Sequence, residues 1–424
     1  MRAERFEWGD PRELAMEIRS WPAAEAHIVL LDEIESAVMD RRDAAVLELT
    51  GRYDATERPP TELRVDPGEP EAALRGLDAE LREALEIAAA NIRAVAEAQV
   101  EAEPRLVKLA QGHSVEVREV PIEAAGIYVP GGRAAYPSTV LMCCVPAAVA
   151  GVERLALASP PGPDGRLPSV VLAAAALCGV SEVYAMGGPQ AIFALAHGTE
   201  SVKPVDLIAG PGNRIVQDAK RRVFGLVGID SLAGPSELMV IAGHDTNVEW
   251  AALDLCAQAE HGVDSPLLVA ATEDAVLDAI ERATKSEAES RHSVSEAGMA
   301  LVQVPDLADA VALANAFAPE HLQIMSEDAY ALAPHVRTAG CVFVGATAAT
   351  AFGDYAAGSN HVLPTGGAGR FSGPLGPGTF RRRIANVTLP GRAAEALAPH
   401  VDALAGAEGF PVHGESARAR GSMR

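Results

Sequence analysis

The sequence predicts an α/β protein built from two parallel-sheet domains, with a small helical segment at the N-terminus and a helical tail domain at the C-terminus. Three observations predict this class. Short β-rich runs alternate with alanine-rich helical stretches over most of the chain. The 424 residues exceed what one hydrophobic core normally serves, and 49% of them are hydrophobic, as in a globular protein.

The elements follow in order along the chain. Residues 28–50 and 77–100 predict amphipathic helices, because apolar residues recur every three or four positions and charges occupy the other face. From GIYVPGG at residue 126, strand, turn and helix repeat, and a second such series starts at SELMVIAG at residue 236. These repeats predict βαβ units and two Rossmann-like parallel sheets.

The chain after residue 362 has a different texture. The glycine-rich stretch LPTGGAGRFSGPLGPGTF leads into a tail that we expect to be helical and too small to bury a core of its own. The resulting division has four parts: an N-terminal segment, 1–24; a first α/β domain, 25–126 with 238–372; a second α/β domain, 127–237; and a C-terminal tail domain, 373–424.

Charge and composition exclude several classes of function. The 35 Lys and Arg against 58 Asp and Glu give a net charge of -23, which repels nucleic acid and anionic membrane surfaces. The N-terminus has no apolar signal region and the chain has no run of about 18 apolar residues. Five cysteines without CxxC spacing favour a reducing compartment. We expect a soluble, cytoplasmic protein that binds neither nucleic acid nor membranes.

Three glycine-rich turns follow predicted strands: YVPGGRAAYPSTV, MGGPQA and AGPGNR. In open parallel sheets, ligands bind beyond the carboxyl ends of the strands. The dinucleotide fingerprint G-x-G-x-x-G is incomplete, since Gly210 and Gly212 are followed by Ile215 where the third glycine belongs. The turns therefore leave open whether they bind a nucleotide or only reverse the chain.

Candidate metal ligands occur in three places. Gln258 and His261 share one face of a predicted helix, Asp354 and His361 lie in a stretch that we expect to be a loop, and His413 lies in the tail. Nitrogen and oxygen donors without thiolates suit Zn²⁺. For His261, the alternative is a surface or helix-capping histidine.

The segment FAPEHLQI places Glu320 and His321 side by side after Pro319. Such a pair can supply an imidazole base and a carboxylate that activates water. An ion pair at the end of a helix is the plainer interpretation.

Taken together, the motifs GIYVPGG, GGPQAI, GPGN, AKRRVFGLVGID, AGPSE, QAEHG, APEHL and GDYAAGSNHVLPTGG resemble those of the histidinol dehydrogenase family in order and spacing, from about residue 25 to the end. The resemblance implies the last enzyme of histidine biosynthesis. That enzyme oxidises L-histidinol through L-histidinal to L-histidine with two NAD⁺, as a homodimer with one zinc ion per site.

The resemblance also implies roles for individual residues. Glu320 and His321 correspond to the catalytic pair. The zinc ligands would be Gln258, His261, Asp354 and His413; the substrate contacts would be these four with Ser236, His321, His361 and Glu408; the NAD contacts would be Tyr128, Gln190 and Asn213. The tail motif AEGFPVHGES is a short match, and in the family the tail reaches the partner subunit's site. His321 would take the hydroxyl proton, and Glu320 would activate water for the aldehyde step.

Other functions remain open at this point. A related zinc- and NAD-dependent dehydrogenase could act on another small hydroxy compound, although His361 and Glu408 favour an amino-alcohol with an imidazole. A zinc hydrolase would use Glu320 without a nucleotide, and a metal-binding protein would need no such pair. A covalent route through Cys143 or Cys144 conflicts with the apolar residues that flank both thiols.

Overall fold

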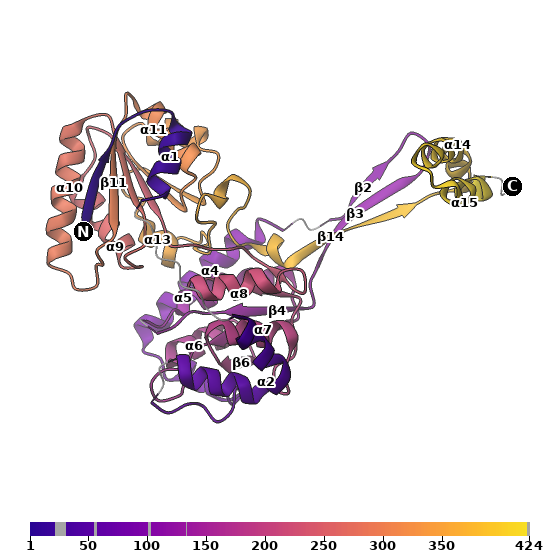
Figure 1. Cartoon of the computed structure of the whole chain (residues 1–424), viewed down its shortest axis with the longest axis horizontal. Helices are drawn as coiled ribbons and strands as arrows, with labels where there is room; N and C mark the ends of the chain where they lie inside the picture. Colours follow the sequence, from indigo (N-terminus) through magenta and orange to yellow (C-terminus); the bar gives the residue numbers. More distant parts are fainter. Residues whose placement is uncertain (22–30, 55–56, 101–102, 133, 422–424) are drawn as a thin grey trace. The chain divides into compact units, whose positions relative to one another are not determined.

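The computed structural model describes the chain except residues 22–30, 55–56, 101–102, 133 and 422–424 (Figure 1). It consists of two compact units. The first comprises Met1–Ala98 and Glu123–Phe380, and the second comprises Gln99–Ile122 and Arg381–Arg424. Both parallel sheets lie in the first unit, so the predicted α/β class with two parallel sheets is confirmed.

A five-stranded parallel sheet has the order β6-β5-β4-β7-β8. The chain builds outward from β4 in one direction and then returns to add β7 on the other side, which makes a switch point between β4 and β7. Its strands and the helices between them are β4 (Ala124–Tyr128), α5 (Pro137–Ala150), β5 (Arg154–Ser159), α6 (Ser169–Leu177), β6 (Glu182–Ala185), α7 (Gly188–His197), β7 (Leu207–Ala209), α8 (Arg214–Val223) and β8 (Gly228–Ile229).

A six-stranded parallel sheet has the order β1-β11-β10-β9-β12-β13 and its own switch point between β9 and β12. The central strands β9 and β10 are buried along their whole length, as expected for a parallel sheet with both faces covered. Its elements are β1 (Arg2–Phe6), β9 (Leu238–Ala242), α9 (Val248–Ala259), β10 (Leu267–Ala271), α10 (Asp274–Glu289), β11 (Gly298–Gln303), α11 (Leu307–Phe317), β12 (His321–Met325), α12 (Ala329–Leu332), β13 (Cys341–Val344) and α13 (Thr350–Tyr355).

The helices before residue 98 pack differently from the expected division, which grouped residues 25–126 with the six-stranded sheet. Here α2 (Leu31–Tyr53) packs on α7, α3 (Glu69–Arg75) on α6, and α4 (Ala79–Glu97) on α5. Val38 and Val46 of α2 enter the same core as Ile192 of α7. An amphipathic pattern predicts that a face is buried but not which sheet it covers.

Residues 1–21, the described part of the expected N-terminal segment, do not form a separate helical segment. Strand β1 pairs in parallel with β11 at the edge of the six-stranded sheet, and α1 (Pro11–Arg19) packs against α11 (Figure 1). Helix α1 begins at Asp10, whose carboxylate accepts from the backbone N–H groups of Arg12 and Glu13. The segment is therefore part of the sheet's own fold.

The second unit contains an antiparallel sheet that the sequence analysis missed. Strand β3 (Ser114–Pro121) pairs with β2 (Arg105–Lys108) and with β14 (Arg381–Thr388), and this ribbon carries α14 (Gly391–Glu408) and α15 (Pro411–Gly421) (Figure 1). The tail, expected to be helical, therefore contains the strand β14 as well as two helices. Its partner strand lies some 260 positions earlier, so no local pattern reveals the pairing. Among the described residues, no helix is long and apolar enough to cross a membrane.

Candidate active site

The candidate catalytic residues lie at the amino edge of the six-stranded sheet. His321 is the first residue of β12 and pairs with Leu238, the first residue of β9. Glu320 and Glu237 directly precede these two strands. The chemistry is thus centred at the switch point, but at the opposite edge from the one where ligands of open parallel sheets usually bind.

The turn before Glu320 is tightly defined. Helix α11 ends at Phe317, and Ala318 adopts a left-handed conformation with φ 50° while its N–H donates to the carbonyl of Ala314. Pro319 cannot continue the helix, and the chain enters β12 two residues later. The conformation of this turn therefore fixes how the backbone at Glu320 and His321 enters the strand.

Glu320 is buried, with 6% of its surface exposed. Its Oε2 accepts hydrogen bonds from Ser236 Oγ at 2.5 Å and from the Glu237 backbone N–H at 2.8 Å. Ser236 Oγ in turn accepts from Gln258 Nε2 at 2.7 Å. Burial raises the pKa of Glu320 to about 7, although His321 and the two donors favour the charged form. This carboxyl group is therefore poised to exchange a proton near neutral pH.

The two nitrogens of His321 have different surroundings. Nδ1 lies 3.1 Å from the backbone carbonyl of Glu237, which can only accept, so Nδ1 carries a proton and donates it. Nε2 is buried without a hydrogen bond to any described residue and lies 3.4 Å from Asp354 Oδ1. Burial lowers the pKa of His321, but Glu320 and Asp354 outweigh it and raise the value to about 9. In the neutral ring, Nε2 is the base.

The candidate metal ligands Gln258, His261 and Asp354 gather beside this pair. Gln258 lies in the last turn of α9, and His261 follows the end of that helix. Asp354 lies in the short helix α13 rather than in the expected loop. Its pKa is raised by burial but lowered overall by His321, His361 and His261. Burial lowers the pKa of His261, which keeps this imidazole neutral.

This donor set fits a borderline divalent ion such as Zn²⁺. It offers a neutral imidazole, an ionised carboxylate and an amide oxygen, the forms in which these groups bind a metal. Within the described part of this single chain, no three His, Cys, Asp or Glu side chains form a metal cluster. Three protein donors leave a tetrahedral ion one ligand short.

His361 lies in the loop after α13, and both of its ring nitrogens have partners. Nδ1 donates to the backbone carbonyl of Asp354 at 2.8 Å, and Nε2 lies 3.2 Å from the Thr139 hydroxyl on α5. Burial lowers its pKa, so the ring is neutral. His361 therefore joins the catalytic edge to a helix of the five-stranded sheet.

The candidate cofactor residues lie at the carboxyl edge of the five-stranded sheet. Tyr128 ends β4, and Asn213 caps α8 directly after β7, on either side of the switch point. Gly210 has φ 120°, and a side chain there would meet the Tyr128 carbonyl at 2.0 Å. The Tyr128 hydroxyl accepts from the Gly188 N–H at 3.1 Å. The glycine-rich turns therefore converge on one place.

Gln190 and two groups that the sequence analysis overlooked support these turns. Gln190 is fully buried, its Oε1 has no partner among the described residues, and its Nε2 lies 3.5 Å from Asp54 Oδ2. Lys220 and Asp230 hold Gly210 between them through its carbonyl at 2.9 Å and its N–H at 2.8 Å. Lys220 is part of a charged run that resembles a solvated helix face, so its burial gives no signal in the sequence.

Glu408 and His413 belong to the second unit, where both are exposed. Glu408 is the last residue of α14, and the His413 ring lies 5.5 Å from that of Phe410 in the loop before α15. Within the described part of the chain, neither side chain forms a hydrogen bond or an ion pair.

Comparison with known proteins decides the family. The sequence profile described as histidinol dehydrogenase matches residues 23–421. The chain belongs to the histidinol dehydrogenase family. Histidinol dehydrogenases of Synechococcus sp. and Pseudomonas aeruginosa are each 44% identical over 92% of this chain, covering 91% and 89% of their own lengths. The crystal structure of histidinol dehydrogenase from Elizabethkingia anophelis superposes with a TM-score of 0.91 at 30% identity, covering 99% of this chain and 98% of that one.

The expectation of a histidinol dehydrogenase, an oxidoreductase of histidine biosynthesis, is therefore confirmed. Two other features of the structure concern groups outside this site. The first is the pair of cysteines considered for a covalent route. Cys143 and Cys144 are fully buried, and their thiol pKa values are raised, by burial for Cys143 and by contact with Cys178 and burial for Cys144, so neither is a ready nucleophile.

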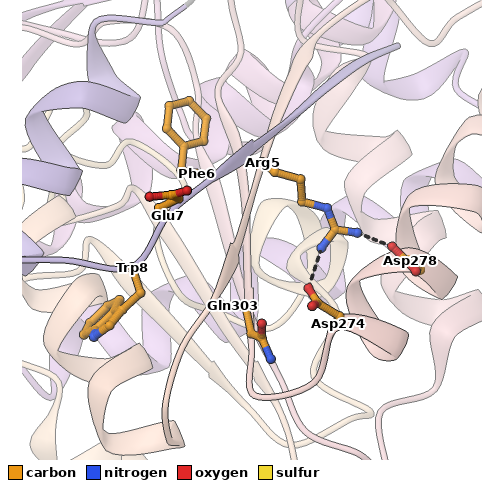
Figure 2. Close-up of a pocket in the computed structure, with 7 residues that line it drawn as sticks. All are labelled: Arg5, Phe6, Glu7, Trp8, Asp274, Asp278 and Gln303. Carbon is orange, nitrogen blue, oxygen red and sulfur yellow. Dashed lines mark hydrogen bonds and ion pairs between the residues drawn. The ribbon is translucent and has the colours of Figure 1, made fainter.

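The second feature is a surface cavity of about 650 Å³ at the far edge of the six-stranded sheet (Figure 2). None of the candidate site residues lines it. Arg5 in this cavity is already paired with Asp274 and Asp278, as the dashed lines in Figure 2 show. The cavity is lined by Arg5, Phe6, Glu7, Trp8, Asp274, Asp278 and Gln303.

Proposed function

We propose that this histidinol dehydrogenase oxidises L-histidinol through L-histidinal to L-histidine at the amino edge of the six-stranded sheet, with Zn²⁺ and two NAD⁺. The observation that carries the proposal is the buried pair Glu320 and His321. One is an imidazole whose Nδ1 is held by the Glu237 carbonyl, so that Nε2 is the nitrogen that gains or loses a proton, and the other is a carboxyl group whose pKa lies near 7. Two oxidations need two bases for two different protons.

His321 is proposed to act in the alcohol step. Its Nδ1–H is engaged with the Glu237 carbonyl, so the ring is held in one orientation and the proton of the substrate hydroxyl goes to Nε2. NAD⁺ supplies the hydride acceptor, and Tyr128, Gln190 and Asn213 would hold it at the carboxyl edge of the five-stranded sheet.

Glu320 is proposed to act in the aldehyde step. Its carboxylate removes a proton from water, which adds to the retained aldehyde, and the resulting hydrate is then oxidised. Hydrogen bonds from Ser236 and the Glu237 N–H fix the carboxylate. Ser236 is also a proposed contact to the substrate. The order of the two steps follows from the oxidation levels of alcohol and aldehyde.

The Zn²⁺ ion would be held by Gln258, His261 and Asp354, with His413 of a second subunit as the missing ligand. There it would serve as a template for orienting the imidazole and amine of the substrate. Support comes from the three donors gathered beside His321 and from the lowered pKa values of His261 and Asp354. His361 and Glu408 are the proposed further contacts to the amino-alcohol.

A homodimer is proposed because the second unit leaves large apolar side chains uncovered. Leu404 is 66% exposed, Phe410 55% and Val412 69%, all next to Glu408 and His413. Such a patch on a small unit typically marks a protein interface. A second copy of this chain would cover it and bring His413 to a metal site. The net charge of -23 disfavours nucleic-acid partners.

All five cysteines are free thiols, which supports a reducing cytoplasm as the compartment. The runner-up function is a related zinc- and NAD-dependent dehydrogenase of another small hydroxy compound. One assay separates the two: purified protein is given limiting histidinol with and without NAD⁺, and NADH absorbance is followed. Two NADH per histidinol with little free aldehyde is the expected result, whereas no NADH from histidinol would favour the runner-up.

A further inference from the structure

Arg19, the last residue of α1, reaches the turn that carries the catalytic pair. Its guanidinium makes a forked ion pair with Glu237, with Nη1 2.6 Å from Oε1 and Nη2 3.1 Å from Oε2. The same group donates to the carbonyl of Phe317, from Nε at 3.2 Å, and to that of Ala318, from Nη2 at 3.3 Å. One side chain therefore ties the end of α11 to the start of β9.

Glu237 connects this ion pair to the chemistry through its backbone. Its N–H donates to Glu320 Oε2 at 2.8 Å, and its carbonyl accepts from His321 Nδ1 at 3.1 Å. Its side chain is buried and accepts one further bond, from the Gly366 N–H at 3.0 Å. A shift of this single residue would move the partners of both bases together.

Arginine suits this position better than lysine does. The guanidinium is planar and always charged, and its five donors serve a carboxylate and two carbonyls at once. A lysine ammonium would keep the charge but not the fork. Without Arg19, Glu237 would be a buried carboxylate that has lost its counter-charge, so its chain segment would have to rearrange.

We propose that Arg19 is a positioning residue for both oxidation steps, acting through Glu237 and the turn Phe317–Ala318 on the placement of Glu320 and His321. The proposal rests on the catalytic roles proposed above for these two residues. It assigns a function to the N-terminal segment, which contains no other candidate site residue and precedes the residues 23–421 that the family profile matches.

The test compares Arg19→Ala with Arg5→Ala in the full-length enzyme. Arg5 is the matched control, because it belongs to the same segment and also forms ion pairs, with Asp274 and Asp278, but contacts neither strand end. Alcohol and aldehyde oxidation are measured separately, per folded protein, together with the melting temperature, the KM for NAD⁺, and the effect of millimolar guanidinium.

The expected result for Arg19→Ala is a loss of kcat on the order of 10²-fold in both half-reactions. The KM for NAD⁺ should stay near the wild-type value, guanidinium should restore much of the kcat, and Arg19→Lys should remain impaired. Arg5→Ala should behave like wild type. Glu237→Gln provides a second variant, with the same dual loss, if Arg19→Ala folds poorly.

Two results would overturn the proposal. One is a folded Arg19→Ala enzyme with normal kcat. The other is a loss that only follows the unfolded fraction and is not relieved by guanidinium. Full activity of Glu320→Gln and His321→Ala would instead refute the proposed catalytic roles, so failure of the two ideas can be told apart.

Discussion

Nε2 of His321 lies 3.4 Å from Oδ1 of Asp354, so the proposed base and a proposed metal ligand are immediate neighbours. Asp354 helps to raise the pKa of His321. A cation that takes up this carboxylate would remove part of that effect and add a positive charge nearby, and both changes lower the pKa of the imidazole. A metal ion bound by Asp354 would therefore also change the base strength of His321.

The first prediction concerns the metal. His261→Ala and Asp354→Asn should each weaken zinc binding by at least about 10²-fold, because each removes a donor from an already short ligand set. Zinc content after exhaustive dialysis measures this directly. Glu260→Gln is the matched control, since Glu260 is an exposed carboxylate in the same turn as His261. Full zinc occupancy in both variants would exclude these residues from the metal site.

The second prediction separates the two bases. Glu320→Gln should lower aldehyde oxidation by about 10² to 10⁴-fold and alcohol oxidation far less, since only the aldehyde step needs activated water. His321→Ala should damage alcohol oxidation. Histidinal supplied directly isolates the second step, and equal losses in both steps for Glu320→Gln would contradict this division.

The third prediction concerns how the free energy of unfolding depends on pH through Asp54, which lies beside the glycine-rich turn at Gly187. Burial raises the pKa of Asp54 from 3.8 to about 6, although its carboxylate accepts from the Gly187 N–H at 3.2 Å. The folded state therefore holds this proton more tightly than the unfolded state. Its stabilising contribution is complete below pH 3.8 and is lost as the pH rises through about 6.

Asp54→Asn mimics the protonated side chain at every pH. Its free energy of unfolding should therefore rise relative to wild type between about pH 4 and pH 7, by at most about 3 kcal/mol for a shift of about two pKa units. Urea unfolding of both proteins across this range provides the measurement. Two curves that run parallel in pH would show that Asp54 is not the group responsible.

The fourth prediction concerns the tail. If His413 completes the partner subunit's site, a mixed dimer of His321→Ala and His413→Ala chains has one site with both defects and one with neither. Each variant alone should be nearly inactive. Refolding an equal mixture should make about half the dimers mixed, so about a quarter of wild-type activity should return. If His413 served its own subunit, mixing would restore nothing.

Much of the fold was predictable because the strands and helices of a parallel sheet alternate regularly along the sequence. The series of strands from Ala124 to Val344 follows the predicted alternation, and the pair Glu320 and His321 does meet in one buried place. Local sequence patterns did not reveal which segments far apart in the sequence contact one another. The pairing of β14 with β3, the docking of α2 on α7, and the contact of Arg19 with Glu237 all join segments far apart in sequence.

The edge at which the site lies was also beyond prediction. The motif residues were recognisable, but Glu320 and Glu237 occupy loops that enter strands, while the usual expectation places ligands where strands end. Asp354 was expected in a loop because the residues after it are rich in glycine and serine. Tertiary contacts of Thr350 and Gly353, which are both buried, favour one more helical turn than that composition suggests.

Ala318 is one of two described non-glycine residues with positive φ, and it stands two positions before Glu320. For an alanine this conformation costs about 1 to 2 kcal/mol relative to a right-handed one. Glycine would relieve that cost, yet it would also let the turn explore many more backbone shapes in the unfolded and folded chain. Ala318→Gly would thus remove the strain of this backbone conformation and make the turn easier to form. It would also make the turn more flexible, so the side chains of Glu320 and His321 would be held in less well-defined positions.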